Sequence, residues 1–409
     1  MINVALVGIG GYGASLLNTL ANCQAKGVCK LVAAADGKAG ELPQAKKLAD
    51  ENVKVFTDAL AMFKEMRGKC QLAVIGTGIP SHEFLATAAA RHGFCLHLEK
   101  PPAATVQEVD NMLKALDDNG VFCQVGFQAV HGSGIRFLKQ RIVEGRLGEL
   151  VSLSCFANWP RWDAYFARNA WAGRLKAGDT WVLDGPATNA LCHQLANMLL
   201  LANTQPGRYA QPTAVRAELY SAGTVEAHTT AAIEITTAGG PKAYFLGSHV
   251  APAVDCQSVG PIIVIKGSKG TGVYSHPCRI DYADGSFEEQ QREKDPSTLM
   301  MLNLIEAVEK GDESLLRCPL AEARKAVLVI DGAHESSGRV HHIDQPHARE
   351  VVEEEGRRFV VDGMEDVLKT CADQCLLPSD LKNPPAWAVA GEEFNLDAYN
   401  HFPRRFAIR

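Results

Sequence analysis

The sequence lacks the features that would place a protein in a membrane or on nucleic acid. No apolar run approaches the roughly 20 residues that a transmembrane helix needs. The 41 Lys and Arg residues are outnumbered by 47 Asp and Glu residues, so the formal charge is −6 and a nucleic-acid binder's basic excess is absent. The start of the chain also lacks the basic segment and small-residue cleavage site of a secretory leader. We therefore expect a cytoplasmic protein that binds neither nucleic acid nor membrane.

Metal-site patterns are absent as well. The twelve cysteines are scattered, and no Cys-x-x-Cys pair or cysteine–histidine cluster has zinc-site spacing. His341, His342 and His347 lie in a polar stretch that is more typical of a solvated loop than of a metal site. The sequence thus predicts reduced, mostly buried thiols and no metal centre.

The chain has enough apolar residues to form more than one hydrophobic core. A chain of 409 residues corresponds to two or three domains at about 150 residues each. Its hydrophobic share of 46% and charged share of 22% are ordinary for a globular protein, which excludes a mostly disordered chain.

The first motif joins a strand to a helix. A short β-branched run, residues 2–7, leads into Gly-x-Gly-x-x-Gly at residues 8–13, and a helical pattern follows. This context is typical of a dinucleotide-binding turn. Gly8 permits the tight turn, Gly10 lets backbone N–H groups approach a pyrophosphate, and Gly13 lets the helix pack close to the strand. The N-terminus of the helix then favours the phosphates.

A second apolar run ends in Asp36, 23 residues after Gly13. A carboxylate there would accept hydrogen bonds from the ribose hydroxyls and repel a 2′-phosphate, which favours NAD over NADP. Lys38 weakens that preference, because it could pair with a phosphate. A glycine-rich turn that binds nothing is the alternative, and the strand, the helix and Asp36 argue against it.

Strand and helix patterns continue to alternate as far as residue 125, which predicts a doubly wound parallel sheet. Ligands of such sheets bind at the carboxyl ends of the strands. The residues that we expect to bind the cofactor are Gly8, Gly10, Gly11, Tyr12, Gly13, Asp36, Thr77, Gly78, Pro80, His82, Glu99, Lys100 and Gln128.

The sequence Leu98-Glu99-Lys100-Pro101 makes the pattern more specific. Together with the glycine motif and Asp36, it resembles the Gfo/Idh/MocA oxidoreductases. Residues 127–150, 184–201 and 304–337 look like that family's joining, catalytic and closing helices. The resemblance implies a Rossmann domain, a C-terminal domain on an open, mainly antiparallel sheet, and a Lys-Pro bond that is often cis. It also implies a bound nicotinamide, a polyol or sugar-derived substrate, and a homodimer or homotetramer formed through the sheet.

The catalytic prediction rests on residues 184–201. Asp184 before Gly185-Pro186 predicts a helix N-cap. Asn189, His193 and Asn197 would then share one face of the helix. We predict His193 as the general base and acid, Lys100 as the cation that holds the reacting hydroxyl, and Asn189 as a hydroxyl ligand. Many family members have Asp at the position of Asn189. The amide in this chain therefore leaves open either the ordinary dehydrogenase mechanism or the identity of the base.

Residues 158–181 hold four of the chain's five tryptophans, interspersed with arginines and carboxylates. Aromatic faces beside forked donors suit a carbohydrate ring. An alternative is a structured loop packed by its own aromatic side chains. The expected substrate-binding residues are Arg161, Trp162, Asp163, Tyr165, Arg168, Trp171, Asn189 and His193.

We divide the chain into a nucleotide-binding domain (1–127), a substrate and oligomerisation domain (128–340) with mostly antiparallel strands, and a C-terminal extension (341–409). The leading hypothesis is an NAD-dependent oxidoreductase that transfers a hydride between nicotinamide and a hydroxyl of a sugar, sugar acid or glycoside. Alternatives are a redox-neutral, NAD-using glycosidase or lyase of the same family and a non-catalytic NAD-sensing regulator.

Overall fold

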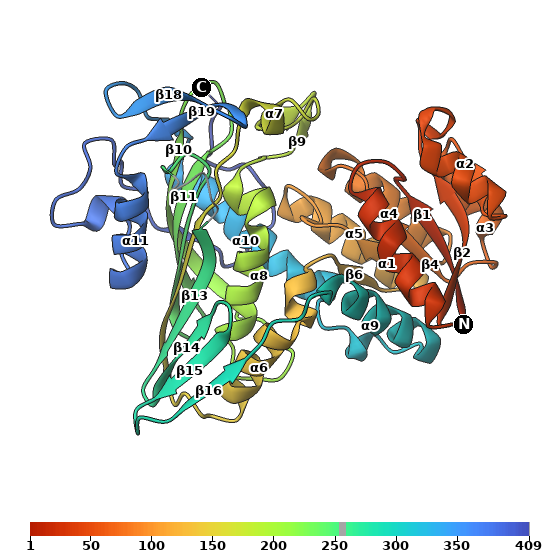
Figure 1. Ribbon diagram of the computed structural model, residues 1–409, viewed down its shortest axis with the longest axis horizontal. Helices are drawn as coiled ribbons and strands as arrows, with labels where there is room; N and C mark the ends of the chain where they lie inside the picture. The colour runs from red at the N-terminus through yellow and green to blue at the C-terminus, as the bar shows by residue number, and fades with distance from the viewer. Residues whose placement is uncertain (253–258, 409) are drawn as a thin grey trace. The chain divides into compact units, whose positions relative to one another are not determined.

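The computed structural model describes residues 1–252 and 259–408, which form two compact units (Figure 1). Unit 1 comprises residues 1–103, 107–132 and 294–324, and unit 2 comprises residues 104–106, 133–293 and 325–409. This division differs from the predicted one in two ways. Residues 294–324, assigned to the second domain, return to unit 1, and the extension beyond residue 340 is part of unit 2.

Unit 1 is built on a six-stranded parallel sheet of order β3-β2-β1-β4-β5-β6, the doubly wound arrangement that the sequence predicts. Its strands are β1 (Ile2–Val7), β2 (Cys29–Ala35), β3 (Lys54–Phe56), β4 (Leu72–Ile75), β5 (Cys95–Leu98) and β6 (Cys123–Val125). The helices that connect them are α1 (Gly13–Ala25), α2 (Pro43–Asp50), α3 (Ala59–Met66), α4 (His82–Arg91) and α5 (Val106–Asn119).

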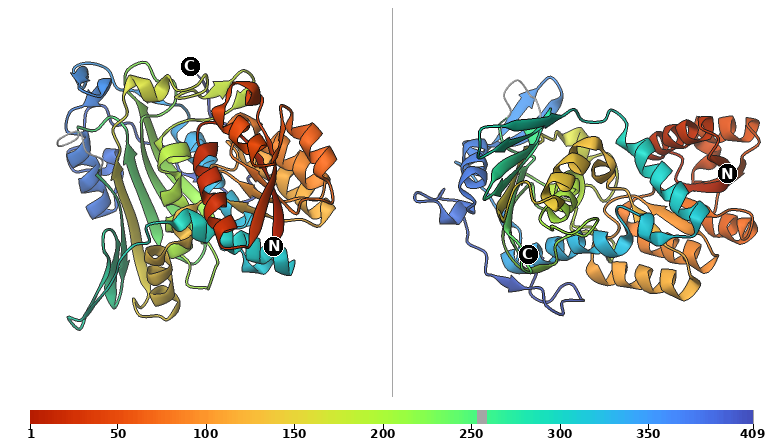
Figure 2. Two further views of the ribbon diagram at one scale, coloured as in Figure 1. Left: turned by 45° about the vertical axis from the view of Figure 1, so that its right-hand side comes forward. Right: turned by 90° about the horizontal axis from the view of Figure 1, so that it is seen from below.

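Helix α9 (Pro296–Lys310) is the reason why residues 294–324 belong to unit 1. Its residues Met301, Leu304 and Ile305 are buried in the same core as the strands β1, β2 and β4. Figure 2 shows this helix against the nucleotide-binding domain although the second sheet precedes it in the chain. The apolar spacing of the helix therefore completes a core most of whose members belong to the first 74 residues.

Unit 2 is built on a ten-stranded, mainly antiparallel sheet of order β16-β15-β14-β13-β7-β12-β11-β10-β17, in which β20 also pairs with β10. The strands that the sequence predicts are β7 (Leu150–Asn158), β10 (Pro212–Ser221), β11 (Thr230–Thr237), β12 (Lys242–Ser248), β13 (Val259–Gly267) and β14 (Gly270–Tyr274). Four further strands were not anticipated, namely β15 (Cys278–Tyr282), β16 (Phe287–Gln290), β17 (His341–His342) and β20 (Phe394–Asn395).

Helices cover both faces of this sheet. Helices α6 (Ser133–Val143) and α8 (Cys192–Leu201) lie on one face, and α11 (Met364–Gln374) packs against β7 and β12 from the other (Figures 1 and 2). The apolar cluster under α11 includes Phe156, Tyr244 and Leu246 of the sheet together with Met364 and Leu368. The extension is thus a folded layer of unit 2. Further elements of the unit are α7 (Asp163–Phe166), β8 (Lys176–Ala177), β9 (Thr180–Trp181), β18 (Ala348–Glu353) and β19 (Gly356–Val361), and α10 (Leu320–Ser337) belongs to it from residue 325 onward.

The described residues bear on the expectations about membrane spans, metal ligands, cysteines and the loop at His341. Within residues 1–252 and 259–408, no helix combines the length and the apolarity needed to cross a bilayer. The same residues hold no group of three potential metal ligands. The described cysteines are free thiols, most of them buried, and Cys256 lies outside the described residues. The prediction of a solvated loop at His341 and His342 is wrong, because these residues form β17 and pair with β10.

Candidate functional site: a nucleotide pocket and a polar turn

The turn between β1 and α1 has the geometry that its glycines predict. Gly8 and Gly11 adopt φ values of +89° and +54°, which favour glycine. A Cβ atom on Gly13 would lie 2.1 Å from the carbonyl oxygen of Gly8, so only glycine fits there. Neighbouring Tyr12 precedes α1 and is 45% exposed. The turn is exposed at Gly11 and Tyr12.

Asp36, at the end of β2, faces this turn. Its carboxylate accepts hydrogen bonds from the backbone N–H groups of Ile9 (2.8 Å), Gly10 (3.2 Å) and Lys38 (2.9 Å). Burial by itself would raise the pKa of Asp36, but these hydrogen bonds and the charge of Lys38 outweigh it and lower the pKa. A fixed negative charge therefore stands beside the glycine turn at neutral pH.

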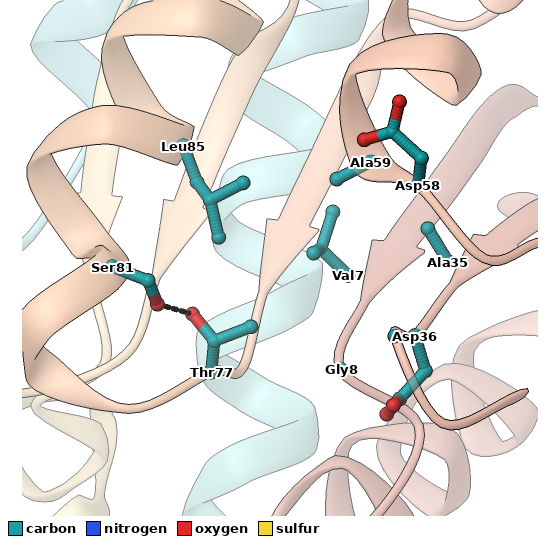
Figure 3. A pocket seen from close by; sticks show the side chains of 10 residues that line it. Val7, Gly8, Ala35, Asp36, Asp58, Ala59, Thr77, Ser81 and Leu85 are labelled. Carbon is teal, nitrogen blue, oxygen red and sulfur yellow. Dashed lines mark hydrogen bonds between the residues drawn. The ribbon is translucent and has the colours of Figure 1, made fainter.

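A pocket of about 290 Å³ opens between the ends of the strands. Figure 3 shows Asp36 on the side of Gly8, and Thr77 and Ser81 on the opposite side. Asp58 and Ala59, at the start of α3, line a third side. Its shape and lining suit a nucleoside, with apolar walls and a carboxylate placed for hydroxyl groups.

Asp58 lines the pocket but is not among the residues predicted from the sequence, although its position after a strand indicates such a role. It follows the strand pattern of residues 53–56, and its side chain caps α3 by accepting hydrogen bonds from Leu60 N–H (3.0 Å) and Ala61 N–H (3.2 Å). An N-capping carboxylate immediately after a parallel strand lies at the ligand-binding edge of the sheet.

The loops after β4 and β5 are tied together by His82, which is 1% exposed. Its Nε2 lies 3.0 Å from the carbonyl oxygen of Thr77, and its Nδ1 lies 2.9 Å from that of Pro101. Burial lowers the pKa of His82, so the ring is neutral and has one N–H to donate. The ring therefore lies between two loops at the pocket and can donate to only one of the two carbonyl oxygens, and cofactor binding by His82 stays a prediction.

Glu99 is another internal support. It is 5% exposed, its Oε1 lies 3.2 Å from Nε2 of His97, and its Oε2 accepts the N–H of Lys100 at 3.2 Å. A Cβ atom on Gly126 would lie 2.9 Å from Oε1, so glycine at 126 makes room for the carboxylate. Lys100 is half-buried, and its bond to Pro101 is cis, as the resemblance implies.

The other predicted positions of unit 1 lie at the same edge of the sheet. Thr77 accepts a hydrogen bond from Ser81 (2.7 Å) at the pocket wall. Gly78 and Pro80 follow in the turn that leads into α4, and half-buried Gln128 begins the short helix after β6.

In unit 2, the predicted catalytic helix is divided. Pro186–Ala190 form one π-helical turn, and α8 begins only at Cys192. The prediction that Asp184 caps this helix is therefore wrong. Its buried carboxylate instead accepts hydrogen bonds from Nδ2 of Asn189 (2.7 Å), Gly173 N–H (2.8 Å) and Arg168 (3.2 Å). His193, half-buried, lies in the first turn of α8.

The aromatic segment separates into two groups. Arg168 lies 3.7 Å from the ring centroid of Tyr165 and 5.4 Å from that of Trp171, and Arg161 lies 4.6 Å from that of Tyr165. Arg168 of this stack also donates a hydrogen bond to Asp184. Trp162 and Asp163 turn away from it, because Trp162 donates to Glu353 (3.0 Å) and Asp163 pairs with Arg357 (3.2 Å) of the β18–β19 hairpin.

The fold and the glycine turn define a dinucleotide-binding Rossmann protein. The model of the oxidoreductase family with an NAD-binding Rossmann fold, GFO_IDH_MocA, matches residues 2–127. Residues 2–127 are therefore similar to the NAD-binding domain of this oxidoreductase family.

Two curated relatives are similar over part of their length. An inositol 2-dehydrogenase of Azotobacter vinelandii is 28% identical over 199 residues, 47% of this chain and 52% of the relative. A 2,7-anhydro-N-acetylneuraminate hydratase of Mediterraneibacter gnavus is 26% identical over 171 residues, 42% of this chain and 40% of the relative. The matches thus span about half the length of these relatives or less.

Solved structures extend the likeness to both units. The WlbA dehydrogenase of Bordetella pertussis, crystallised with NADH and UDP-GlcNAcA, superposes with a TM-score of 0.66 at 21% identity. The superposition covers 82% of this chain and 96% of that protein. At this identity the likeness establishes a shared fold.

Proposed function

We propose that the protein is an NAD-dependent oxidoreductase that transfers a hydride between nicotinamide and a hydroxyl group of a sugar, sugar acid or polyol. The observation that carries the proposal is the pocket in which Asp36 stands beside the glycine turn of an NAD-binding Rossmann domain. The relative named inositol 2-dehydrogenase supports a substrate rich in hydroxyl groups.

The preference for NAD follows from Asp36. Its carboxylate is held in the charged form by three backbone N–H groups and can accept hydrogen bonds from ribose hydroxyls. A 2′-phosphate at the same place would meet that negative charge, and exposed Lys38 offers only partial compensation. NAD should therefore bind more tightly than NADP.

The nicotinamide, when bound, supplies the hydride acceptor and donor. In this proposal His193 takes the proton of the reacting hydroxyl, since an imidazole suits reversible proton transfer near neutral pH. The ammonium of Lys100 stabilises the negative charge that develops on the substrate oxygen. Asn189, whose Nδ2 donates to Asp184, binds a substrate hydroxyl in this proposal.

We further propose that the stack of Arg161, Tyr165, Arg168 and Trp171 contributes the sugar-binding wall. Trp162 and Asp163 are engaged by the β18–β19 hairpin and contribute less directly.

A homodimer or homotetramer remains a prediction. Helix α11 covers the sheet at β7 and β12 on the face opposite α8, so any pairing through that face uses the strands beyond α11 (Figure 1). Light scattering during gel filtration measures the mass directly.

One experiment tests the proposed activity. The purified protein is analysed for bound nucleotide and then incubated with a panel of polyols, sugars, sugar acids and aryl glycosides, with NAD or NADP. NADH formation with one substrate class is expected. Release of product without net NADH would replace the proposal with redox-neutral chemistry, and NAD binding without turnover across the panel would replace it with a sensor.

A further inference from the structure

The C-terminal tail, defined here as residues 394–406, is bound to unit 2 along its whole length. It begins as β20, which pairs with β10, and ends against α10. Glu335 of α10 is 1% exposed, and its carboxylate accepts hydrogen bonds from the hydroxyl of Tyr399 (2.6 Å) and the backbone N–H of Phe406 (2.9 Å). The N–H groups of Arg404 and Arg405 donate to the same carboxylate. Four donors on one buried carboxylate fix the end of the tail.

This anchoring places two phenylalanines against Trp181 and His334, from which contacts lead to the polar turn, defined here as residues 184–190. The ring centroids of Phe402 and Phe406 lie 5.0 and 6.2 Å from that of Trp181. The same two rings lie 6.0 and 5.0 Å from the ring of His334. Phe402 and Phe406 are 1% and 6% exposed, so both are part of the packed interior.

From these contacts, two routes lead to the turn that carries Asn189. Trp181 precedes it directly in the chain, and Leu183 between them adopts φ of +48°, a conformation that needs support from its surroundings. On the other route, the ring of His334 lies 5.2 Å from that of His228. The ring of His228 in turn covers Gly185, where a Cβ atom would come within 2.4 Å of it.

His228 transmits position through packing alone. Among the described residues, neither of its ring nitrogens has a hydrogen-bond partner, and the side chain is 1% exposed. Burial, with the nearby His334 and His249, holds the pKa of His228 well below its ordinary value, so the ring stays neutral. Its place against Gly185 therefore depends on the packing of His334. The ring of His334 is held on one side by Nδ1, 2.8 Å from the carbonyl oxygen of Ile330, and on the other by the two phenylalanines.

We propose that Phe402 and Phe406 are positioning residues, and that the docked tail holds residues 184–190 so that Asn189 and His193 keep their orientation. The proposal rests on the function proposed above for Asn189 and His193. It gives the extension a role in turnover without contact with the substrate. A tail that is only part of the fold would stabilise unit 2 as a whole and leave the turn as ordered as before.

Four variants separate these cases. Phe402→Ala and Phe406→Ala remove the rings at the turn, and Phe406→Leu keeps an apolar side chain. Trp387→Ala is the matched control, because Trp387 belongs to the same extension but packs against Tyr220, 4.9 Å between ring centroids. Each variant is measured for hydrogen–deuterium exchange of residues 182–192, kcat, KM, NAD affinity and thermal unfolding.

The proposal expects faster exchange in residues 182–192 and a kcat lowered about 10- to 100-fold in both alanine variants, as for a misplaced catalytic group. NAD affinity should change little, Phe406→Leu should recover most of kcat, and Trp387→Ala should lower the melting temperature alone. Unchanged exchange in both alanine variants would overturn the proposal. Faster exchange with kcat unchanged would overturn the role in turnover.

The exchange measurement also separates this inference from the proposed function. If the parent protein turns over none of the panel, the oxidoreductase assignment fails. The exchange of residues 182–192 then still decides whether the tail orders the turn.

Discussion

Acidification from about pH 7.5 to about pH 5 should destabilise unit 2 through three buried histidines. His228, His249 and His334 are 1%, 2% and 1% exposed. Burial lowers the pKa of His334 to about 4 and, with the charge of Arg161, that of His249 to about 3. Burial also places the pKa of His228 well below its ordinary value. The folded protein therefore keeps all three rings neutral at pH 5.

The sign follows from proton linkage. An unfolded histidine titrates near about pH 6.5, so below that pH the unfolded chain binds protons that the folded chain does not. The free energy of unfolding then falls as the pH falls, until the folded pKa is reached. At pH 5 the loss is about 2 kcal/mol for His334 and about 2 kcal/mol for His249. His228 adds in the same direction.

One carboxylate acts in the opposite sense. Burial raises the pKa of Glu218, so its protonation favours the folded state as the pH falls. The expected net loss is still several kcal/mol, a large part of the about 5–15 kcal/mol that stabilises an ordinary protein.

Tryptophan fluorescence measures this loss in unit 2 directly, because all five tryptophans belong to it. Urea titrations between about pH 7.5 and pH 5 give the free energy of unfolding at each pH. His334→Phe should reduce the pH slope, while His401→Gln, at an exposed position, should leave it as in the parent. A parent protein whose unfolding free energy changes by less than about 1 kcal/mol over this range would refute the reasoning.

Three further predictions concern the candidate sites. Lys100→Ala and His193→Ala should abolish turnover, while the NAD affinity measured by calorimetry stays close to that of the parent. Full activity in either variant would remove that residue from the mechanism. Gly13→Ala should weaken NAD binding by at least about tenfold, because its Cβ atom would lie 2.1 Å from the carbonyl oxygen of Gly8, and a calorimetric affinity equal to the parent's would contradict this. Asp184→Asn should lower kcat more than it changes NAD affinity, since the new amide keeps one acceptor oxygen for the three donors of Arg168, Gly173 and Asn189 and loses the charge that pairs with Arg168. Steady-state kinetics with a kcat like the parent's would count against it.

The nucleotide-binding domain could be predicted because its signals are local. Each strand of the parallel sheet is a short apolar run, and each helix follows it after a short link. The glycines at residues 8–13 and Asp36 lie on one strand–turn–helix–strand unit, so spacing alone relates them. Asp58 also follows a strand of this sheet directly, so the same local pattern predicts it at the ligand-binding edge.

Other contacts could not be predicted, because they depend on partners far along the chain or on several donors that compete for one acceptor. Asp184 has the sequence context of an N-cap, but Gly173 and Arg168 from the preceding loop compete for its carboxylate. His82 lies at a strand end like a ligand, yet its buried ring lies between two backbone carbonyl oxygens and donates its one N–H to one of them. Such competition is decided by tertiary packing, which periodicity does not describe.

The extension illustrates the same limit on a larger scale. Its aromatic composition indicated that the tail would dock, but the site of docking depends on Glu335, Trp181 and His334, which lie far from the tail along the chain. A sequence pattern can show that a segment must be buried and still leave its partner undetermined.

Asp184 also explains why an amide stands at residue 189. A carboxylate oxygen accepts hydrogen bonds only, so the group 2.7 Å from Asp184 must be a donor, which assigns Nδ2 of Asn189 to that contact. An aspartate at 189 would place two carboxylates at this distance, with Arg168 as the nearest balancing charge that the described contacts provide. Asn189 and Asp184 are therefore a matched pair. The carboxylate is at Asp184, and the side chain at 189 is its hydrogen-bond donor.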